Sequence, residues 1–178
     1  SLYPPWFLWY DKVSNYEIQV TFMEIRRAAA RDIPGMIALL RQVGEVHHVI
    51  RPDIFCSGAL KYTPAQLQQL LQDETKPIFV ADDGGFVAGY CFCQIRIYEG
   101  STVLTDRKEL YIDDLCVDEN CRGQHIGSAL YDYAVAYAKE IGCQFLTLNV
   151  WCGNDGAMKF YEAMGMNARS ITMETKLC

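Results

Sequence analysis

The sequence predicts an α/β protein in which helices cover both faces of a mixed β-sheet. Its clearest segment starts with a strand pattern, because apolar and polar residues alternate from Leu110 to Val117. After a short polar loop, apolar residues recur at helical spacing from Leu130 to Ile141, and Gly142 is placed to end that helix. Upstream, residues 77–98 indicate a β-hairpin that turns at residues 82–85. Strands and helices of this kind fit a sheet covered by helices.

The first segment of the chain is set apart from the rest. Residues 1–22 are rich in aromatic residues and lack the basic start and clean apolar block of a signal peptide. We interpret them as an N-terminal extension, either natural or added for expression, whose aromatic side chains pack on this domain or on a neighbour. Residues 23–178 are expected to form a single domain.

Before the hairpin, the sequence predicts one strand and three helical segments. The strand is expected from Val20 to Ala28, and Asp32 is placed to cap a first helix that ends near Gly44. Residues 45–50 indicate a short second helix or a turn. A further helix is expected to start at Thr63-Pro64.

Three elements are expected after Gly142. They are a strand from Phe145 to Val150, a helix from Asn154 to Met164 and a final strand from Ala168 to Lys176. The predicted order is therefore β-α-α-α-β-β-β-α-β-α-β.

Composition argues against several classes of protein. The 178 residues carry a net charge of −6, so neither nucleic acid nor an anionic membrane is an expected partner. Charges interrupt the apolar runs well before the length of a membrane span. The eight cysteines form no C-x-x-C pair, and the three histidines suit no common zinc pattern. We expect reduced thiols, no metal and a cytoplasmic location.

The loop from Arg122 to Ser128 is the candidate binding site. A strand, a tight loop and a helix aim free backbone N–H groups and a positive helix end at one point. That point suits an anion, and pyrophosphate is the usual one. The glycine spacing is neither that of a P-loop nor that of a dinucleotide fingerprint. From the loop alone, a β–α turn with incidental glycines is an equal alternative.

Two blocks of sequence resemble the GNAT N-acetyltransferases. The residues R-G-Q-H-I-G from Arg122 to Gly127 resemble the acyl-CoA-binding motif Arg/Gln-x-x-Gly-x-Gly/Ala. The residues N-D-G-A-M-K-F-Y-E-A-M-G-M from Asn154 to Met166 resemble N-x-x-A-x-x-F-Y-E-x-x-G-F/M. The resemblance implies acetyl-CoA as cosubstrate and the GNAT fold, in which two central parallel strands splay apart around the thioester. Here those strands are residues 110–117 and 145–150.

The resemblance also implies roles on the cofactor side. Tyr161 stands where the family often has a catalytic tyrosine that protonates the leaving thiolate, although its helical spacing also fits a core residue. Asn154 is expected to cap its helix and to contact the pantetheine arm. His125 replaces the first glycine of the motif and is either a surface turn residue or a phosphate contact. The expected cofactor-binding residues are Leu115, Cys116, Val117, Arg122, Gly123, Gln124, His125, Ile126, Gly127, Ser128, Asn154 and Tyr161.

Asp113 and Asp114 are the candidate base and its neighbour. Adjacent strand residues point to opposite faces, and an unpaired buried carboxylate is costly, so both need an explanation. Residues 111–117, Y-I-D-D-L-C-V, resemble the Y-L-E-D-F-F-V stretch of diamine acetyltransferases. The resemblance implies that Asp113 is the base, acting directly or through water. The alternative is that one carboxylate caps a loop or pairs with a lysine or arginine.

The acceptor is expected to be a small cationic primary amine. Tyr111, Asp113, Asp114 and Asn149 are the expected acceptor residues, and the interior of this strand has no lysine or arginine. Asn149 stands where ribosomal-protein alanine acetyltransferases usually have glutamate, which argues against a protein N-terminus as the acceptor. A protein-amine acetyltransferase and a non-catalytic acyl-CoA-binding module remain the other options. Because many relatives are dimers, a homodimer is one expected assembly.

Overall fold

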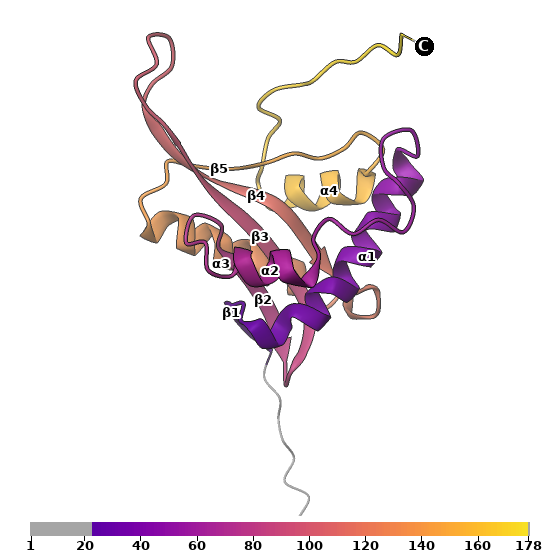
Figure 1. Ribbon diagram of the computed structural model, residues 1–178. Coiled ribbons are helices and arrows are strands. Elements are labelled where there is room, and N and C mark those ends of the chain that lie inside the picture. The colour runs from indigo at the N-terminus through magenta and orange to yellow at the C-terminus, as the bar shows by residue number, and fades with distance from the viewer. Residues whose placement is uncertain (1–22, 178) are drawn as a thin grey trace, which may run out of the picture.

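The computed structural model describes residues 23–177, and the N-terminal extension lies outside them. These described residues form five strands and four α-helices, arranged as Figure 1 shows. In order they are β1 (Glu24–Arg27), α1 (Ile33–Ile50), α2 (Pro64–Leu70), β2 (Ile78–Asp83), β3 (Phe86–Tyr98), β4 (Arg107–Val117), α3 (Ile126–Glu140), β5 (Phe145–Leu148) and α4 (Asp155–Ala163). Short 3₁₀ turns precede α1 (Ala30–Asp32) and α3 (Glu119–Cys121).

The sheet is mixed, as the sequence predicts. Its strands lie in the order β1-β2-β3-β4-β5, and every neighbouring pair is antiparallel except β4 with β5. A parallel pair needs a crossover connection, and α3 supplies it between β4 and β5.

Helices cover both faces of the sheet, which confirms the predicted fold class. One buried cluster joins α1 and α2 to the sheet and includes Met36, Leu40, Leu67 and Tyr90. The other joins α3 to the opposite face, and Phe160, Tyr161 and Met164 of α4 pack against it. In Figure 1, α1 and α2 lie in front of the strands and α3 lies behind them. The two clusters hold β3 and β4 between them.

Helix α1 continues through the glycine that was expected to end it. It runs without a break to Ile50 and stops before Arg51-Pro52, so no separate helix or turn forms at residues 45–50. A Cβ on Gly44 would lie 3.1 Å from the carbonyl oxygen of Ala59. Close packing of the loop on this glycine outweighs its helix-propensity cost of about 1 kcal/mol.

The final strand expected at residues 168–176 does not form. This segment is extended and exposed, and it pairs with no strand among the described residues. Ion pairs tie it down at two places: Arg169 to Glu109 at 2.9 Å and Glu174 to Arg51 at 2.6 Å. The alternating pattern is present, but a strand also requires a ladder partner. In Figure 1 the segment runs away from the sheet toward the C-terminus.

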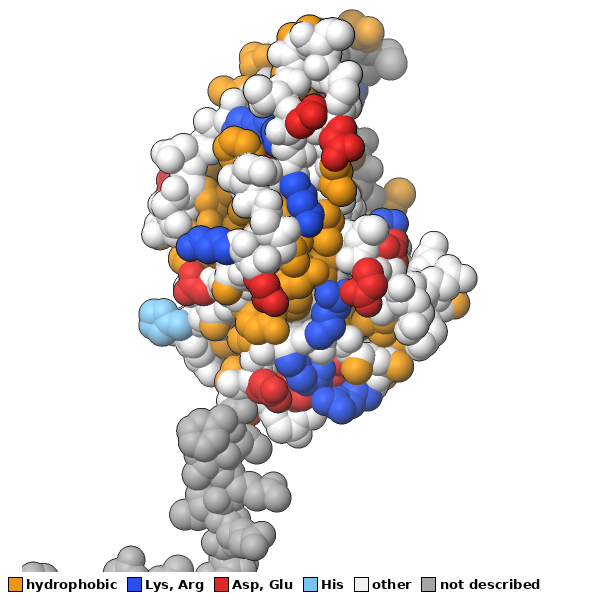
Figure 2. Space-filling view, turned by 90° about the vertical axis from the view of Figure 1, so that its left-hand side faces the viewer, with side chains coloured by type: hydrophobic (Ala, Val, Ile, Leu, Met, Phe, Trp, Pro, Cys, Tyr) orange, Lys and Arg blue, Asp and Glu red, His pale blue; other side chains and the backbone are white. Residues whose placement is uncertain are grey.

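The surface in Figure 2 mixes charges of both signs. Lysine and arginine side chains alternate there with aspartate and glutamate, and no large patch of one sign covers that face. Among residues 23–177, no helix combines the length and apolar character needed to cross a bilayer.

Candidate active site

The candidate site lies where β4 and β5 separate. The two strands pair only from Glu109 with Phe145 to Ile112 with Leu148, whereas β4 continues along β3 to Val117. Beyond Ile112, the outer edge of β4 has no strand partner in the described part of the chain. The expected splaying of the two parallel strands is therefore present.

The loop after β4 presents free backbone N–H groups. Gly123 and His125 both have a left-handed backbone, with φ of 78° and 61°, and α3 starts at Ile126. Within residues 23–177, no backbone N–H group from Arg122 to Ser128 donates a hydrogen bond. These groups and the positive end of α3 can together stabilise an anion.

Gly127 lies where β4, α3 and α4 meet. A Cβ at this position would be 3.5 Å from the Phe160 ring and 3.6 Å from Cγ2 of Val117. These are ordinary contact distances, so the first turn of α3 has just enough room for one more methyl group. The missing side chain keeps the backbone here open to a ligand.

Two residues from the second motif belong to α4 and its N-cap, and α4 approaches Gly127 through Phe160. Asn154 caps α4, because its side chain accepts a hydrogen bond of 3.2 Å from the N–H of Ala157. The Tyr161 ring packs near Tyr131, at 6.4 Å between centroids, and its hydroxyl has no hydrogen-bond partner among the described residues. Burial, followed by the proximity of Cys91 and Asp114, raises the pKa of Tyr161 well above its usual value. Tyr161 therefore stays protonated at neutral pH.

Residues 115–117 alternate between the two faces of the sheet. Cys116 is buried in the α1/α2 cluster, and burial raises the pKa of its thiol to about 12. Leu115 and Val117 pack against the α3 cluster. The side chains are thus occupied by packing, which leaves the backbone as the part of this segment that can reach a ligand.

A β-bulge interrupts β4 at the two aspartates. The β3–β4 register passes from Phe92 with Asp114 to Cys93 with Ile112, so Asp113 is an extra residue without an opposite partner. The expectation of opposite faces assumed regular alternation. The bulge removes that regularity.

Both carboxylates are consequently reached from the α1/α2 side of the sheet. The Tyr62 hydroxyl donates to Oδ2 of Asp113 at 3.2 Å, and the Tyr90 hydroxyl donates to Oδ2 of Asp114 at 2.9 Å. Both tyrosines belong to the α1/α2 cluster. The prediction that the two aspartates face opposite ways is therefore wrong.

The two carboxylates differ in their partners. Lys61, from the loop before α2, places its Nζ 2.7 Å from Oδ2 of Asp113. Asp114 has the neutral Tyr90 hydroxyl instead, and burial raises the pKa of Asp114 above its usual value. Burial and the charge of Asp113 also raise the pKa of Tyr62 to about 12.

Other expected acceptor residues are not brought to this point. The guanidinium of Arg96 lies 3.4 Å above the Tyr111 ring and covers that face. Asn149 is exposed, one residue beyond β5, and no hydrogen bond links it to either aspartate. Glu109, near the start of the same strand, is buried between Arg107 and Arg169.

Three contributors to the site were missed from the sequence. Lys61 and Tyr62 lie about fifty residues before the carboxylates, and Tyr90 lies in the neighbouring strand. The β-strand pattern of residues 86–98 could have placed Tyr90 beside β4. Nothing in the sequence marks Lys61 or Tyr62.

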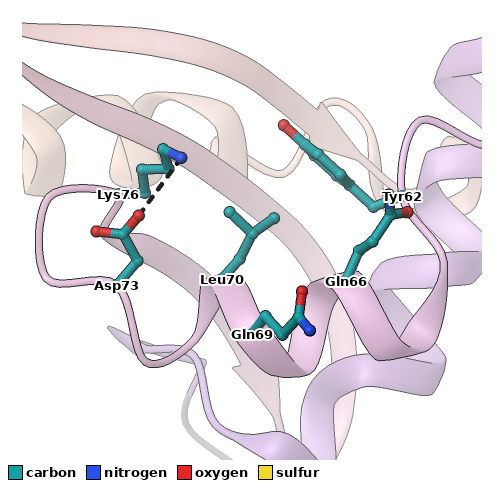
Figure 3. Close-up of a pocket in the computed structure, with 6 residues that line it drawn as sticks. All are labelled: Tyr62, Gln66, Gln69, Leu70, Asp73 and Lys76. Atoms are coloured by element: carbon teal, nitrogen blue, oxygen red, sulfur yellow. Dashed lines mark ion pairs between the residues drawn. The ribbon is translucent and has the colours of Figure 1, made fainter.

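A shallow hollow of about 280 Å³ lies next to Tyr62, along α2. Figure 3 shows its lining, with the Tyr62 ring extending from the start of α2 across the sheet. On the far side of the hollow, Lys76 pairs with Asp73 at 3.4 Å. A smaller hollow shares Tyr62, Leu70 and Lys76 with it and is also lined by Asp113.

A mixed sheet covered by helices on both faces, with a parallel pair that stops at Ile112 and an amide-lined loop after β4, defines an α/β protein with an anion-binding loop. A profile of the acetyltransferase (GNAT) family matches residues 44–166, more than half of the chain. The chain therefore belongs to the GNAT family.

Individual relatives agree with this assignment. The thialysine N-ε-acetyltransferase of Bos taurus is 26% identical over 156 residues, which cover 82% of this chain and 85% of that protein. An uncharacterised N-acetyltransferase of Methanocaldococcus jannaschii is 28% identical over 102 residues, or 57% of this chain, and the match spans only 44% of that protein. The crystal structure of a mutant BH1408 protein from Bacillus halodurans is similar, with 32% identity and a TM-score of 0.84. That match covers 88% of this chain and 100% of the other.

Proposed function

We propose that this protein transfers an acetyl group from acetyl-CoA to the primary amine of a small, cationic acceptor. The observation that carries the proposal is the end of β4: its pairing with β5 stops at Ile112, two carboxylates follow at once, and the loop after the strand has free backbone amides. Acetyl transfer needs these two parts, because the cofactor is an anion and the acceptor arrives as an ammonium ion.

The cofactor side follows from the loop and from α4. The amides of residues 122–128 hold the pyrophosphate at the start of α3. The pantetheine arm runs past Gly127 and Asn154 into the gap between β4 and β5. Backbone groups from Leu115 to Val117 then stabilise the negative charge that develops on the thioester oxygen.

The chemical step uses one base and one acid. Asp113 takes a proton from the acceptor's ammonium, directly or through a water, and the neutral amine attacks the thioester carbon. The C–N bond forms, the C–S bond breaks and the leaving thiolate takes a proton from Tyr161. The second proton that the nitrogen loses on becoming an amide then returns the Tyr161 phenolate to its neutral form. The role needs a protonated phenol, which Tyr161 is at neutral pH, although burial raises its pKa and makes it a weaker acid than an exposed tyrosine.

The acceptor class follows from charge. Asp113 and Asp114 lie together on one side of β4, where they can receive an ammonium group. The thialysine acetyltransferase that this chain resembles acts, by its name, on a small amine-bearing amino acid. A protein amine is the second candidate, since the exposed loop before α2 would admit a peptide. A module that binds acyl-CoA without turnover is the third.

A thiol-release assay with a panel of amines tests the proposal. The wild type is expected to release CoA thiol with at least one small cationic amine. Tyr161→Phe should keep CoA affinity and lower kcat by about 10²-fold, because general-acid catalysis contributes that much. Met158→Leu, on the exposed part of the same helix, serves as the control. Release with peptides alone would favour the second candidate, and no release despite tight CoA binding would favour the third.

A further inference from the structure

The Asp113 carboxylate is paired with a primary ammonium group of the protein itself, that of Lys61. Nζ of Lys61 lies 2.7 Å from Oδ2 of Asp113 and 3.3 Å from the backbone oxygen of the same residue. The Tyr62 hydroxyl donates to the same Oδ2, and Nζ lies 5.6 Å from the centre of the Tyr62 ring. A carboxylate, a carbonyl and an aromatic face are the groups that hold an alkylammonium ion.

This ion pair is suited to exchange. Lysine has a flexible stem and a single charged head, and the Lys61 side chain is 38% exposed. Glu109, by contrast, is buried between two arginines, at 2.6 and 2.9 Å. Exposed ion pairs contribute little to stability, so an arriving ammonium can displace Lys61 at small cost.

The site at rest has little net negative charge to offer a polycation. Lys61 neutralises Asp113. Burial raises the pKa of Asp114 and so favours its uncharged form, although the Tyr90 hydroxyl that donates to it acts in the opposite direction. An acceptor that brings only positive charge would leave the displaced Lys61 without a partner.

We propose that Lys61 is a specificity-determining residue that selects acceptors which carry a carboxylate in addition to the reacting amine, as a lysine-type amino acid does. The acceptor's ammonium replaces Lys61 on Asp113, and the displaced lysine turns on its stem to pair with the acceptor's carboxylate. One ion pair thus becomes two, and Lys61 keeps a partner. This inference rests on the proposed function and narrows its acceptor.

A matched pair of acceptors isolates the effect. Lysine and 1,5-diaminopentane share the reacting amine and differ by one carboxylate. For the wild type we expect kcat/KM to favour lysine by roughly tenfold or more, because a hydrogen bond to a charged group is worth at least that factor. Lys61→Met should reduce the ratio of the two kcat/KM values by a similar factor, because kcat/KM for free lysine should fall and kcat/KM for the diamine should rise.

Lys76→Met is the matched control. Lys76 also pairs with an aspartate and has a similar exposure, but its partner is Asp73 rather than Asp113. Lys76 lines the same small hollow as Asp113 but forms its ion pair with Asp73, so its loss should leave the ratio within about twofold. An equal change in both variants would show a general field effect and overturn the inference. Lys61→Gln repeats the test if the methionine variant does not fold.

Binding separates this inference from the proposed function. Calorimetry with CoA present gives the affinity for each acceptor without any turnover. A preference for lysine that disappears in Lys61→Met supports the inference even if no acetyl transfer occurs, and in that case the proposed function alone fails. A preference unchanged by Lys61→Met, in binding or in turnover, overturns the inference while the proposed function stands.

Discussion

His125 occupies a left-handed backbone position that costs a residue with a Cβ about 1 kcal/mol. It is the N-cap of α3, yet its side chain makes no capping hydrogen bond. No local hydrogen bond of the side chain therefore offsets the energy cost of this backbone conformation. What the conformation achieves is the direction of the loop, whose N–H groups remain free to bind a ligand.

Gly127 gives a test at the scale of one residue. Gly127→Val should weaken CoA binding by roughly tenfold or more, because its two methyl groups would fill the space between Phe160, Val117 and the cofactor. Gly127→Ala is the control, since a single Cβ meets only ordinary contacts there. Calorimetry measures both affinities, and circular dichroism checks the fold. Unchanged affinity in a folded valine variant would remove the loop from the cofactor site.

At the scale of elements, β1 is tied to the start of α1 by one arginine. Arg26 donates to both oxygens of Asp32 at 2.8 Å and to Oδ2 of Asp82 at 2.7 Å. Asp32 also accepts the N–H of Ala29 at 2.7 Å. Burial opposes ionisation of Asp32, but Arg26 and Ala29 hold its pKa below the usual value. Arg26, followed by the amide of Gly85, does the same for Asp82.

Arg26→Gln should therefore destabilise the protein by about 3 kcal/mol at pH 7, because it leaves a buried carboxylate without its cation. The folded-state pKa values of Asp32 and Asp82 are lowered, so their stabilising contribution is present above about pH 4 and lost as pH falls below it. Urea unfolding at pH 7 and pH 3.5 should show the deficit shrinking in acid. Arg27→Gln is the control, with an exposed partner and an expected cost within about 0.5 kcal/mol. A deficit independent of pH would contradict this account.

At the scale of the whole molecule, residues 168–177 are exposed and contribute no side chain to the hydrophobic core. Ile171 is 77% exposed and Met173 is 85% exposed, although both alternate with polar residues as a strand would. Apolar side chains left in water contribute nothing to the folded state of this chain.

Replacing both Ile171 and Met173 by serine should accordingly change the free energy of unfolding by less than about 0.5 kcal/mol. Leu130→Ala, in the α3 cluster, should instead cost about 2–5 kcal/mol. Urea unfolding at two protein concentrations measures both variants. A loss that depends on concentration in the double variant would contradict an unpartnered segment and indicate that it packs on a second copy of the chain.

Sequence patterns determined the parts of this protein that depend on neighbours along the chain. Alternation located the strands around residues 77–98 and 110–117, and Gly142 ends α3 with a left-handed backbone as expected. The loop from Arg122 to Ser128 and the cap at Asn154 were also predictable, because short-range hydrogen bonding and backbone freedom specify them.

Only the tertiary structure decided the acceptor side. The bulge at Asp113 depends on how β3 and β4 register, and no local pattern encodes that register. Lys61 and Tyr62 reach the carboxylate from a loop about fifty residues away, because packing of α2 on the sheet brings them there. The missing final strand has the same cause: its pattern is local, but the partner that a strand needs is not.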